Sequence, residues 1–268
     1  MMKNLIYAIM ALVCGVCSAY AGEMQEMVCG DKNLSYCIKH FDRQCSAKNH
    51  GACRIVGDLH YEQKQYSESK KYYELVCDKA NSKDSYQLEL INGGLGNKVP
   101  AIISMKLACG ELARYYYEGL GVRQDFAKAL QYYKKACGLG YAFSCASAGD
   151  SYHLGEGVRQ DFAKALQYHK KACGLGNADS CTKAGGSYLF GKGTKKDFKL
   201  AKSYYEKACE MESAVGCFGL GVMYHVYHGG KSVPQNLSKA KELYGKACDL
   251  GNQDGCDNYK KLNEKGVR

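Results

Sequence analysis

The chain has 268 residues, a formal net charge of +10 at pH 7, 16 cysteines and no tryptophan. Its lysines and arginines are spread along the whole chain, which excludes the concentrated basic face of a nucleic-acid-binding protein. The charge supports only a modest attraction to acidic proteins or surfaces.

Residues 1–21 are predicted to be a signal peptide that is cleaved from the mature protein. Lys3 is followed by an apolar run from Leu5 to Val16 and then by Ala19-Tyr20-Ala21, which is the order of a secretory leader and its cleavage site. The apolar run is too short to cross a bilayer, so we expect no membrane span. The mature protein is therefore expected to be secreted or periplasmic.

The cysteines predict a disulfide framework. Loss of Cys14 and Cys17 with the leader leaves 16 − 2 = 14 cysteines, and an even number in an exported chain indicates bridges. Six pairs have C-x7-C spacing, and the two remaining cysteines, Cys77 and Cys109, form a seventh pair. The cysteines expected in bridges are Cys29, Cys37, Cys45, Cys53, Cys77, Cys109, Cys137, Cys145, Cys173, Cys181, Cys209, Cys217, Cys248 and Cys256. Short C-x2-C pairs and histidines at ligand spacing are missing after residue 21, so we predict no metal site and no cofactor.

Residues 22–52 are predicted to form an N-terminal cap of short helices. The segment is polar and shows no repeat. Three consecutive C-x7-C intervals run from Cys29 to Cys53, so the pairing could be 29–37 with 45–53 or another arrangement.

Two nearly identical stretches define the plan of the following chain. Gly119–Gly140 reads GLGVRQDFAKALQYYKKACGLG and Gly155–Gly176 reads GEGVRQDFAKALQYHKKACGLG, so only two of 22 positions differ. The offset of 155 − 119 = 36 residues is typical of stacked two-helix units. We therefore predict an all-α fold in which residues 53–256 form an α/α solenoid, a curved superhelix of helix pairs.

Each predicted first helix carries its cysteine near its start. Cys145, Ala148, Gly149 and Tyr152 illustrate the spacing of three, four and seven residues that puts side chains on one helix face. A small residue four positions after the cysteine predicts a point where two helices cross closely, because glycine inside a helix is otherwise unfavourable. These small residues are Gly57, Ala113, Gly149, Gly185 and Gly221.

Each predicted second helix begins after an N-cap side chain and ends at a glycine. The N-caps are Asp125, Asp161, Asp197 and Asn236. Gly174-Leu175-Gly176 ends one such helix, because glycine suits a left-handed C-cap. Cys173 then closes the hairpin with Cys181 at the start of the next helix, and a loop this short contributes about 2.5 kcal/mol in the chain-entropy model.

Two regions depart from the period. Residues 78–108 separate Cys77 from Cys109, and we interpret them as two longer helices joined by the glycine-rich turn Gly93–Gly96, with a binding flap as the alternative. Residues 257–268 are polar and are predicted to be a C-terminal cap.

The motif G-x-G-V-x-Q-D-F-x-K-A-L-x-Y-x-x-K-A-C resembles the Sel1-like repeat, a relative of the tetratricopeptide repeat, over roughly Cys53 to Cys256. With a leader and a C-x7-C pair in each repeat, the chain is similar to the Helicobacter cysteine-rich protein family. The resemblance implies a secreted solenoid stapled by disulfides, and it also implies penicillin binding with slow β-lactam hydrolysis.

The residues give no support to a serine or zinc β-lactamase. The S-x-x-K matches Ser67/Lys70, Ser180/Lys183 and Ser238/Lys241 are of a kind that chance produces in a chain rich in serine and lysine, and S-D-N and K-T-G are absent. No catalytic residue can be named, so whether the protein is an enzyme stays open. His169 takes a position that is tyrosine in neighbouring repeats and is interpreted as a packing residue.

Tyrosine is the residue type that points to recognition, since 23 tyrosines accompany no tryptophan. Many, such as Tyr152, are expected in the core. The candidates for a ligand groove are Tyr115, Tyr117, Tyr132, Tyr168 and Tyr204.

The function predicted is a rigid, monomeric scaffold outside the cytoplasm. Its concave surface would bind a peptide, a host or envelope protein, or a cell-wall fragment. The alternative, from the resemblance alone, is a penicillin-binding protein with slow β-lactamase activity that acts on a β-lactam or muropeptide.

Overall fold

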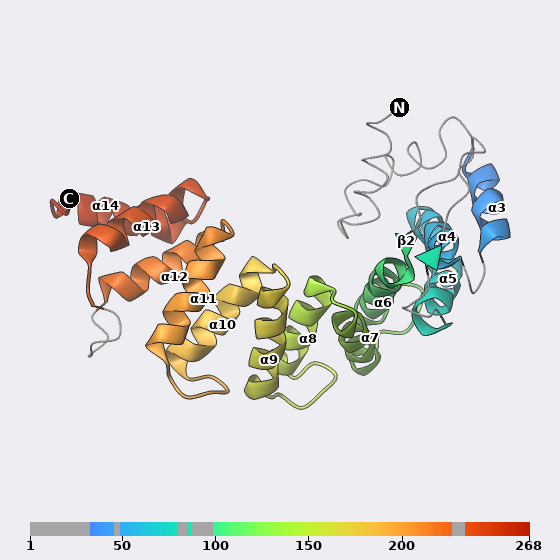
Figure 1. Ribbon diagram of the computed structural model, residues 1–268, viewed down its shortest axis with the longest axis horizontal. Coiled ribbons are helices and arrows are strands. Elements are labelled where there is room, and N and C mark those ends of the chain that lie inside the picture. The colour runs from blue at the N-terminus through green and yellow to red at the C-terminus, as the bar shows by residue number, and fades with distance from the viewer. Residues whose placement is uncertain (1–32, 46–48, 80–84, 87–98, 227–233) are drawn as a thin grey trace. The chain divides into compact units, whose positions relative to one another are not determined.

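The computed structural model describes residues 33–45, 49–79, 85–86, 99–226 and 234–268 (Figure 1). The predicted signal peptide, Cys29 and the turn Gly93–Gly96 lie outside these residues. By internal contacts the chain divides into two compact units, Met1–Tyr141 and Ala142–Arg268. No helix among the described residues is both long enough and apolar enough to cross a membrane.

The first unit consists of helices with one small strand pair. Among its described residues the elements are α3 (Leu34–Gln44), α4 (His50–Glu62), α5 (Tyr66–Lys79), β1 (Ser85–Tyr86), β2 (Val99–Pro100), α6 (Ala101–Glu118) and α7 (Phe126–Gly138). Phe41, Val56 and Leu59 form one buried cluster where α3 meets α4. Tyr73 and Leu112 belong to a second cluster, in which α5, α6 and α7 pack together.

The second unit continues the same alternation of helices without a strand among its described residues. Its elements are α8 (Ala142–Leu154), α9 (Phe162–Gly174), α10 (Ala178–Phe190), α11 (Phe198–Glu210), α12 (Ala214–His225), α13 (Leu237–Asp249) and α14 (Gln253–Glu264). Each helix packs on the next one in the chain, and α10 also contacts α12. Leu166, Tyr205, Leu220 and Leu243 come from different helices and share one buried cluster.

Short disulfides join the second helix of one pair to the first helix of the next. In the second unit Cys173–Cys181 and Cys209–Cys217 have Cα–Cα distances of 4.7 and 4.4 Å. The other bridges with both cysteines described are Cys45–Cys53, Cys77–Cys109 and Cys248–Cys256, and Cys37, Cys137 and Cys145 are also disulfide-bonded. The prediction of a helical solenoid stapled by disulfides is confirmed, and of the N-terminal pairings left open the structure has 45–53.

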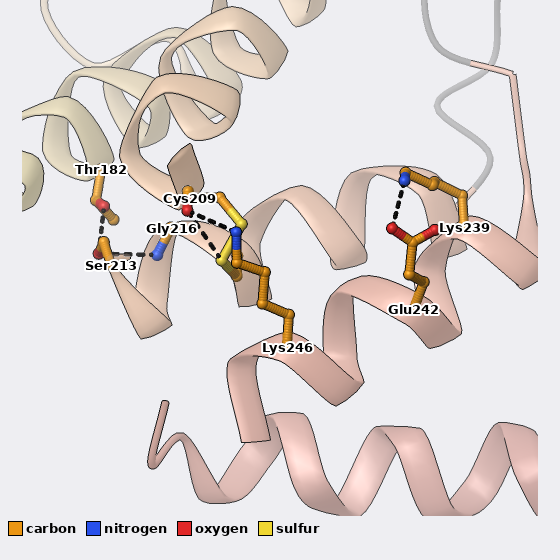
Figure 2. Close-up of a disulfide and its surroundings, with 8 residues drawn as sticks. Thr182, Cys209, Ser213, Gly216, Lys239, Glu242 and Lys246 are labelled. Carbon is orange, nitrogen blue, oxygen red and sulfur yellow. Dashed lines mark hydrogen bonds and ion pairs between the residues drawn. A yellow bond between two sulfur atoms is a disulfide. The ribbon is translucent and has the colours of Figure 1, made fainter. Parts of the chain in front are cut away.

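The Cys209–Cys217 bridge is also supported by polar contacts from neighbouring helices. Figure 2 shows Lys246, which reaches from α13 and donates from Nζ to the carbonyl oxygen of Cys209 at 3.1 Å. Ser213, the N-cap of α12, accepts from the backbone N–H of Gly216 at 3.1 Å. These bonds satisfy backbone groups that a helix end leaves without intrahelical partners.

The second helices begin at the predicted N-caps. The side-chain oxygens of Asp125, Asp161, Asp197 and Asn236 each accept a hydrogen bond of 2.9 Å from the backbone N–H three residues later. An N-cap of this kind stabilises a helix by about 1 kcal/mol. Gly176 follows α9 with φ of +96°, the left-handed conformation that glycine favours.

Four of the glycines that follow a cysteine each receive an aromatic ring from the second helix of the same pair. A Cβ on Gly221 would lie 2.8 Å from the Tyr244 ring, and one on Gly149 would lie 2.7 Å from the His169 ring. Gly57 and Gly185 meet the rings of Tyr73 and Tyr205 in the same way. The close helix crossings predicted from these glycines are therefore present, and each is filled by a flat ring.

Residues 78–108 were interpreted as two longer helices, and this is wrong for the first of the two. Helix α5 ends at Lys79, and Ser85–Tyr86 pairs antiparallel with Val99–Pro100 instead of continuing the helix. Only α6 is long, with 18 residues from Ala101. Pro100 stands just before it, a place that proline tolerates because the first helical N–H groups have no intrahelical acceptor.

Removal of single bridges should destabilise the two units by different amounts. The chain-entropy model gives about 2.5 kcal/mol for the eight-residue separation of Cys173–Cys181 and about 3.7 kcal/mol for the 32-residue separation of Cys77–Cys109. Replacing each pair by alanines and following hydrogen exchange in α9–α10 and in α5–α6 tests this order. A larger loss in the second unit would contradict it.

Gly221→Ala should destabilise the second unit by about 1–3 kcal/mol, because the new methyl group would press on the buried Tyr244 ring. Gly174→Ala is the matched control, since nothing lies within 4 Å of its Cβ position. The control should be neutral or stabilising by up to about 1 kcal/mol. Urea unfolding followed by circular dichroism measures both, and equal effects would contradict the packing argument.

Candidate binding surface

Tyrosines stack in pairs at equivalent positions of successive repeats. In the second unit Tyr152 stacks on Tyr168 and Tyr188 stacks on Tyr204, with ring centroids 5.6 Å apart in both pairs. The first tyrosine of each pair is buried and the second is half-buried. Each pair therefore closes the core with one ring and presents part of the other to solvent.

The first unit contains the same arrangement. The rings of Tyr116 and Tyr132 lie 5.7 Å apart and are nearly parallel, at 6°. The Tyr132 hydroxyl donates to Asp78 at 3.2 Å, and Lys135 pairs with the same carboxylate at 2.8 Å. Burial and the Asp78 carboxylate both raise the pKa of Tyr132, so its hydroxyl stays protonated at neutral pH.

Lysines lie over the buried rings of these pairs. Lys128 Nζ is 4.2 Å from the centroid of the Tyr116 ring, and Lys164 Nζ is 5.5 Å from that of Tyr152. A cation at such distances is attracted by the negative face of the ring, by about 0.5–1 kcal/mol at an exposed site. The surface around the Tyr116–Tyr132 and Tyr152–Tyr168 pairs is therefore both aromatic and positively charged.

The hydroxyls of Tyr168 and Tyr204 make no hydrogen bond within the described residues. Burial raises the pKa of both tyrosines, which keeps the two groups in the protonated, donating form. A ring held flat by stacking beside an unused donor is a suitable contact for a ligand, because little conformational entropy is lost on binding.

Two of the five tyrosines predicted to line a groove do not belong to the stacked pairs. The prediction for Tyr115 is wrong, because its side chain is fully buried and its hydroxyl donates to Ser69 Oγ at 2.7 Å. Tyr117 is half-buried and its ring meets the edge of Phe126 at 5.2 Å, away from the stacked pairs. Tyr132, Tyr168 and Tyr204 are the three that occupy one repeated position.

A buried polar network between α4 and α5 was not found from sequence. Arg54 pairs with Asp58 on the same helix, and the Tyr73 hydroxyl donates to Asp58 at 2.7 Å. Burial, followed by the charge of Asp58, raises the pKa of Glu62 to about 7. The spacing of Arg54 and Asp58, one helical turn apart, was the available signal, but it does not distinguish a surface ion pair from a buried one.

The lysines of the three S-x-x-K matches have other partners. Lys70 lies 3.4 Å from the Glu74 carboxylate, Lys183 lies 2.6 Å from that of Asp150, and Lys241 donates to a backbone carbonyl. Ser180 is completely buried. None of these matches forms a nucleophile activated by a neighbouring base.

His169 is a packing residue in this structure. Its ring lies against Gly149 with 2% of its side chain exposed, and its Nε2 is 3.7 Å from Asp150 Oδ1. Burial lowers the pKa of His169 to about 4; Asp150 opposes this shift and Lys183 adds to it. Among the described residues no group of three potential ligands could hold a metal ion.

The geometry defines an α/α solenoid of cross-linked helix pairs with a repeated aromatic and basic surface. The Sel1 repeat family model matches residues 106–141, 142–177, 178–213 and 214–252, and the chain belongs to this family.

Two solved structures agree with this fold, and a third is similar in sequence. A Sel1 repeat protein from Oxalobacter formigenes is 23% identical over 75% of this chain and 72% of that one, with a TM-score of 0.60. A protective antigen present in uropathogenic Escherichia coli strains is 21% identical over 99% of this chain and 60% of that one, with a TM-score of 0.58. Helicobacter pylori cysteine rich protein B is 38% identical over 50% of this chain and 94% of that one, with a TM-score of 0.40. A comparison with curated proteins finds no match.

His169 should make the second unit sensitive to acid. Its pKa is about 4 in the folded protein against 6.5 for an ordinary histidine, so the unfolded chain takes up the proton first as pH falls. Stability is then full above about pH 6.5 and falls by about 3 kcal/mol towards pH 4. H169Y places at this position the tyrosine that the neighbouring repeats have. In this variant the free energy of unfolding should fall less steeply between pH 6.5 and pH 4. Hydrogen exchange of α8–α10 between pH 4 and 7 measures it, with H153Q as control, and an unchanged slope in H169Y would contradict the assignment.

Proposed function

We propose that this Sel1 repeat protein is an exported scaffold that binds a segment of a peptide or protein across its stacked tyrosines. The Sel1 family fits a scaffold for protein binding. The buried disulfides support an oxidising compartment, which agrees with the leader predicted at residues 1–21 and with a secreted or periplasmic protein. The curvature of the solenoid and its monomeric state are part of the proposal.

The observation that carries this proposal is the repetition of an immobilised, half-buried tyrosine at adjacent repeats. Tyr168 and Tyr204 are 204 − 168 = 36 residues apart and have the same stacking geometry. Two equal contacts one repeat apart suit a ligand that runs along the repeats, such as an extended peptide. Tyrosine is also among the residues that contribute most to protein interfaces.

No comparable observation favours β-lactam hydrolysis. The lysine of each serine–lysine pair that such an enzyme would use is bound to a carboxylate or a backbone carbonyl. Host proteins, envelope proteins and cell-wall peptides remain within the proposed class of ligand, because each can present an extended peptide.

Replacement of the outer tyrosines should weaken ligand binding. Peptides selected from a phage-displayed library on the oxidised protein provide the ligand. Y168A/Y204A is expected to lower the affinity at least tenfold, because a contact tyrosine contributes roughly 1–2 kcal/mol or more. Y168F/Y204F keeps the stacked rings and isolates the hydroxyls, for which a smaller loss is expected. Fluorescence anisotropy measures the affinity of the unsubstituted protein and of each variant.

Y259A is the matched control, because Tyr259 is 40% exposed on α14 of the same unit and belongs to no stacked pair described here. An equal loss in the control, or failure to select any peptide, would contradict the proposal. Circular dichroism of each variant establishes that the helices are retained.

A further inference from the structure

A cavity of about 630 Å³ lies in the first unit beside the stacked pair Tyr116–Tyr132. It is formed by α5, the end of α6, the loop that follows it and the first turn of α7. The lining residues that matter here are Lys70, Tyr116, Val122, Arg123, Asp125 and Lys128. The volume is within the range of about 300–1,000 Å³ that ligand sites occupy and exceeds the space that one inorganic ion needs.

Positive charge exceeds negative charge in this cavity. Three cationic side chains line it against one carboxylate, that of Asp125, and this carboxylate is already the N-cap of α7 and accepts from the Lys128 N–H at 2.9 Å. Arg123 is exposed, and within the described residues neither its guanidinium nor the Lys128 ammonium has an ion-pair partner. Lys70 is 3.4 Å from Glu74, so its charge is partly balanced.

The charges around the equivalent loops of the second unit are arranged differently. Lys164, 36 residues after Lys128, forms an ion pair with Asp161 at 3.2 Å. Where Tyr188 takes the position of Tyr116, the second unit has the buried Leu166, in the same cluster as Tyr188, at the position of Lys70, and Leu200 at the position of Lys128. The first unit therefore has two cations where this repeat of the second unit has leucines, and the Lys128 ammonium lies over the Tyr116 ring without an ion-pair partner among the described residues.

We propose that this cavity binds the carboxylates of an acidic peptide segment. Arg123 offers a planar pair of donors that matches a carboxylate, and Lys70 and Lys128 add positive charge. Val122 and the Tyr116 ring provide apolar surface for the methylene groups of a glutamate side chain. The choice of a peptide as carrier of the carboxylates rests on the proposed function, and it specifies the chemistry of the partner.

The test uses the oxidised protein with fluorescein-labelled hexaglutamate as the probe and hexaserine as the neutral comparison. R123Q/K128Q should weaken hexaglutamate binding by at least tenfold at 50 mM salt, with R123Q alone giving part of the loss. K195Q/K196Q removes the same number of charges from the equivalent loop of the second unit, where both lysines are exposed, and should alter binding less than twofold. Hexaserine should not bind.

Two outcomes would overturn the inference. Equal losses of affinity in the two double variants would mean that hexaglutamate is attracted to the positively charged chain in general. A phosphate site would be indicated if inorganic phosphate displaced the probe at concentrations where free glutamate has no effect. Arg123 is exposed in a loop, so R123Q keeps the test valid if K128Q perturbs the fold. Loss of hexaglutamate binding in R123Q/K128Q but not in Y168A/Y204A would separate this cavity from the stacked tyrosines, so either proposal can fail alone.

Discussion

A short covalent bridge between consecutive repeats is the constraint on which this structure depends. Each repeat buries too little apolar surface to be stable alone, so the contacts between repeats decide whether the fold forms. Cys173–Cys181 and Cys209–Cys217 hold the junctions on both sides of α10–α11 with Cα atoms less than 5 Å apart. Within the same repeat, the Tyr205 ring lies on Gly185 and fixes the two helices against each other. Covalent bonds and ring packing therefore alternate along the chain.

Variation within equivalent positions gives the repeats their individual chemistry. The ring that packs on the first-helix glycine is Tyr205 or Tyr244 in two repeats and His169 in another, which adds a titratable group to an otherwise apolar contact. Lys70 and Leu166 differ in the same manner, and the difference changes the charge beside a stacked tyrosine pair. The scaffold is constant because its caps, glycines and cysteines are constant, while these few positions decide what each surface can bind.

The sequence predicted the features that depend on local spacing. N-caps such as Asp161, the close crossing at Gly149 and the helix-to-helix bridges follow from short intervals that recur in every repeat. Features that depend on distant contacts were not predictable. Tyr115 is buried by contacts with α5, which is 46 residues away at Ser69, and no neighbour in the chain reveals this. The pairing of β1 with β2 uses backbone groups over two residues each, so it leaves no side-chain pattern.

The positions of the bridges also determine which backbone cleavages leave the two fragments covalently linked. Each eight-residue bridge encloses a turn from a second helix to the next first helix, so a cut between Cys173 and Cys181 leaves both pieces covalently joined. The loops inside a repeat are not enclosed by any of these bridges, and the loop before α11 exposes Lys192, Lys195 and Lys196. A trypsin-like protease acting there would divide the chain into fragments held together only by side-chain packing. Lifetime in a protease-rich environment therefore depends on these lysine-bearing loops and not on the cystines.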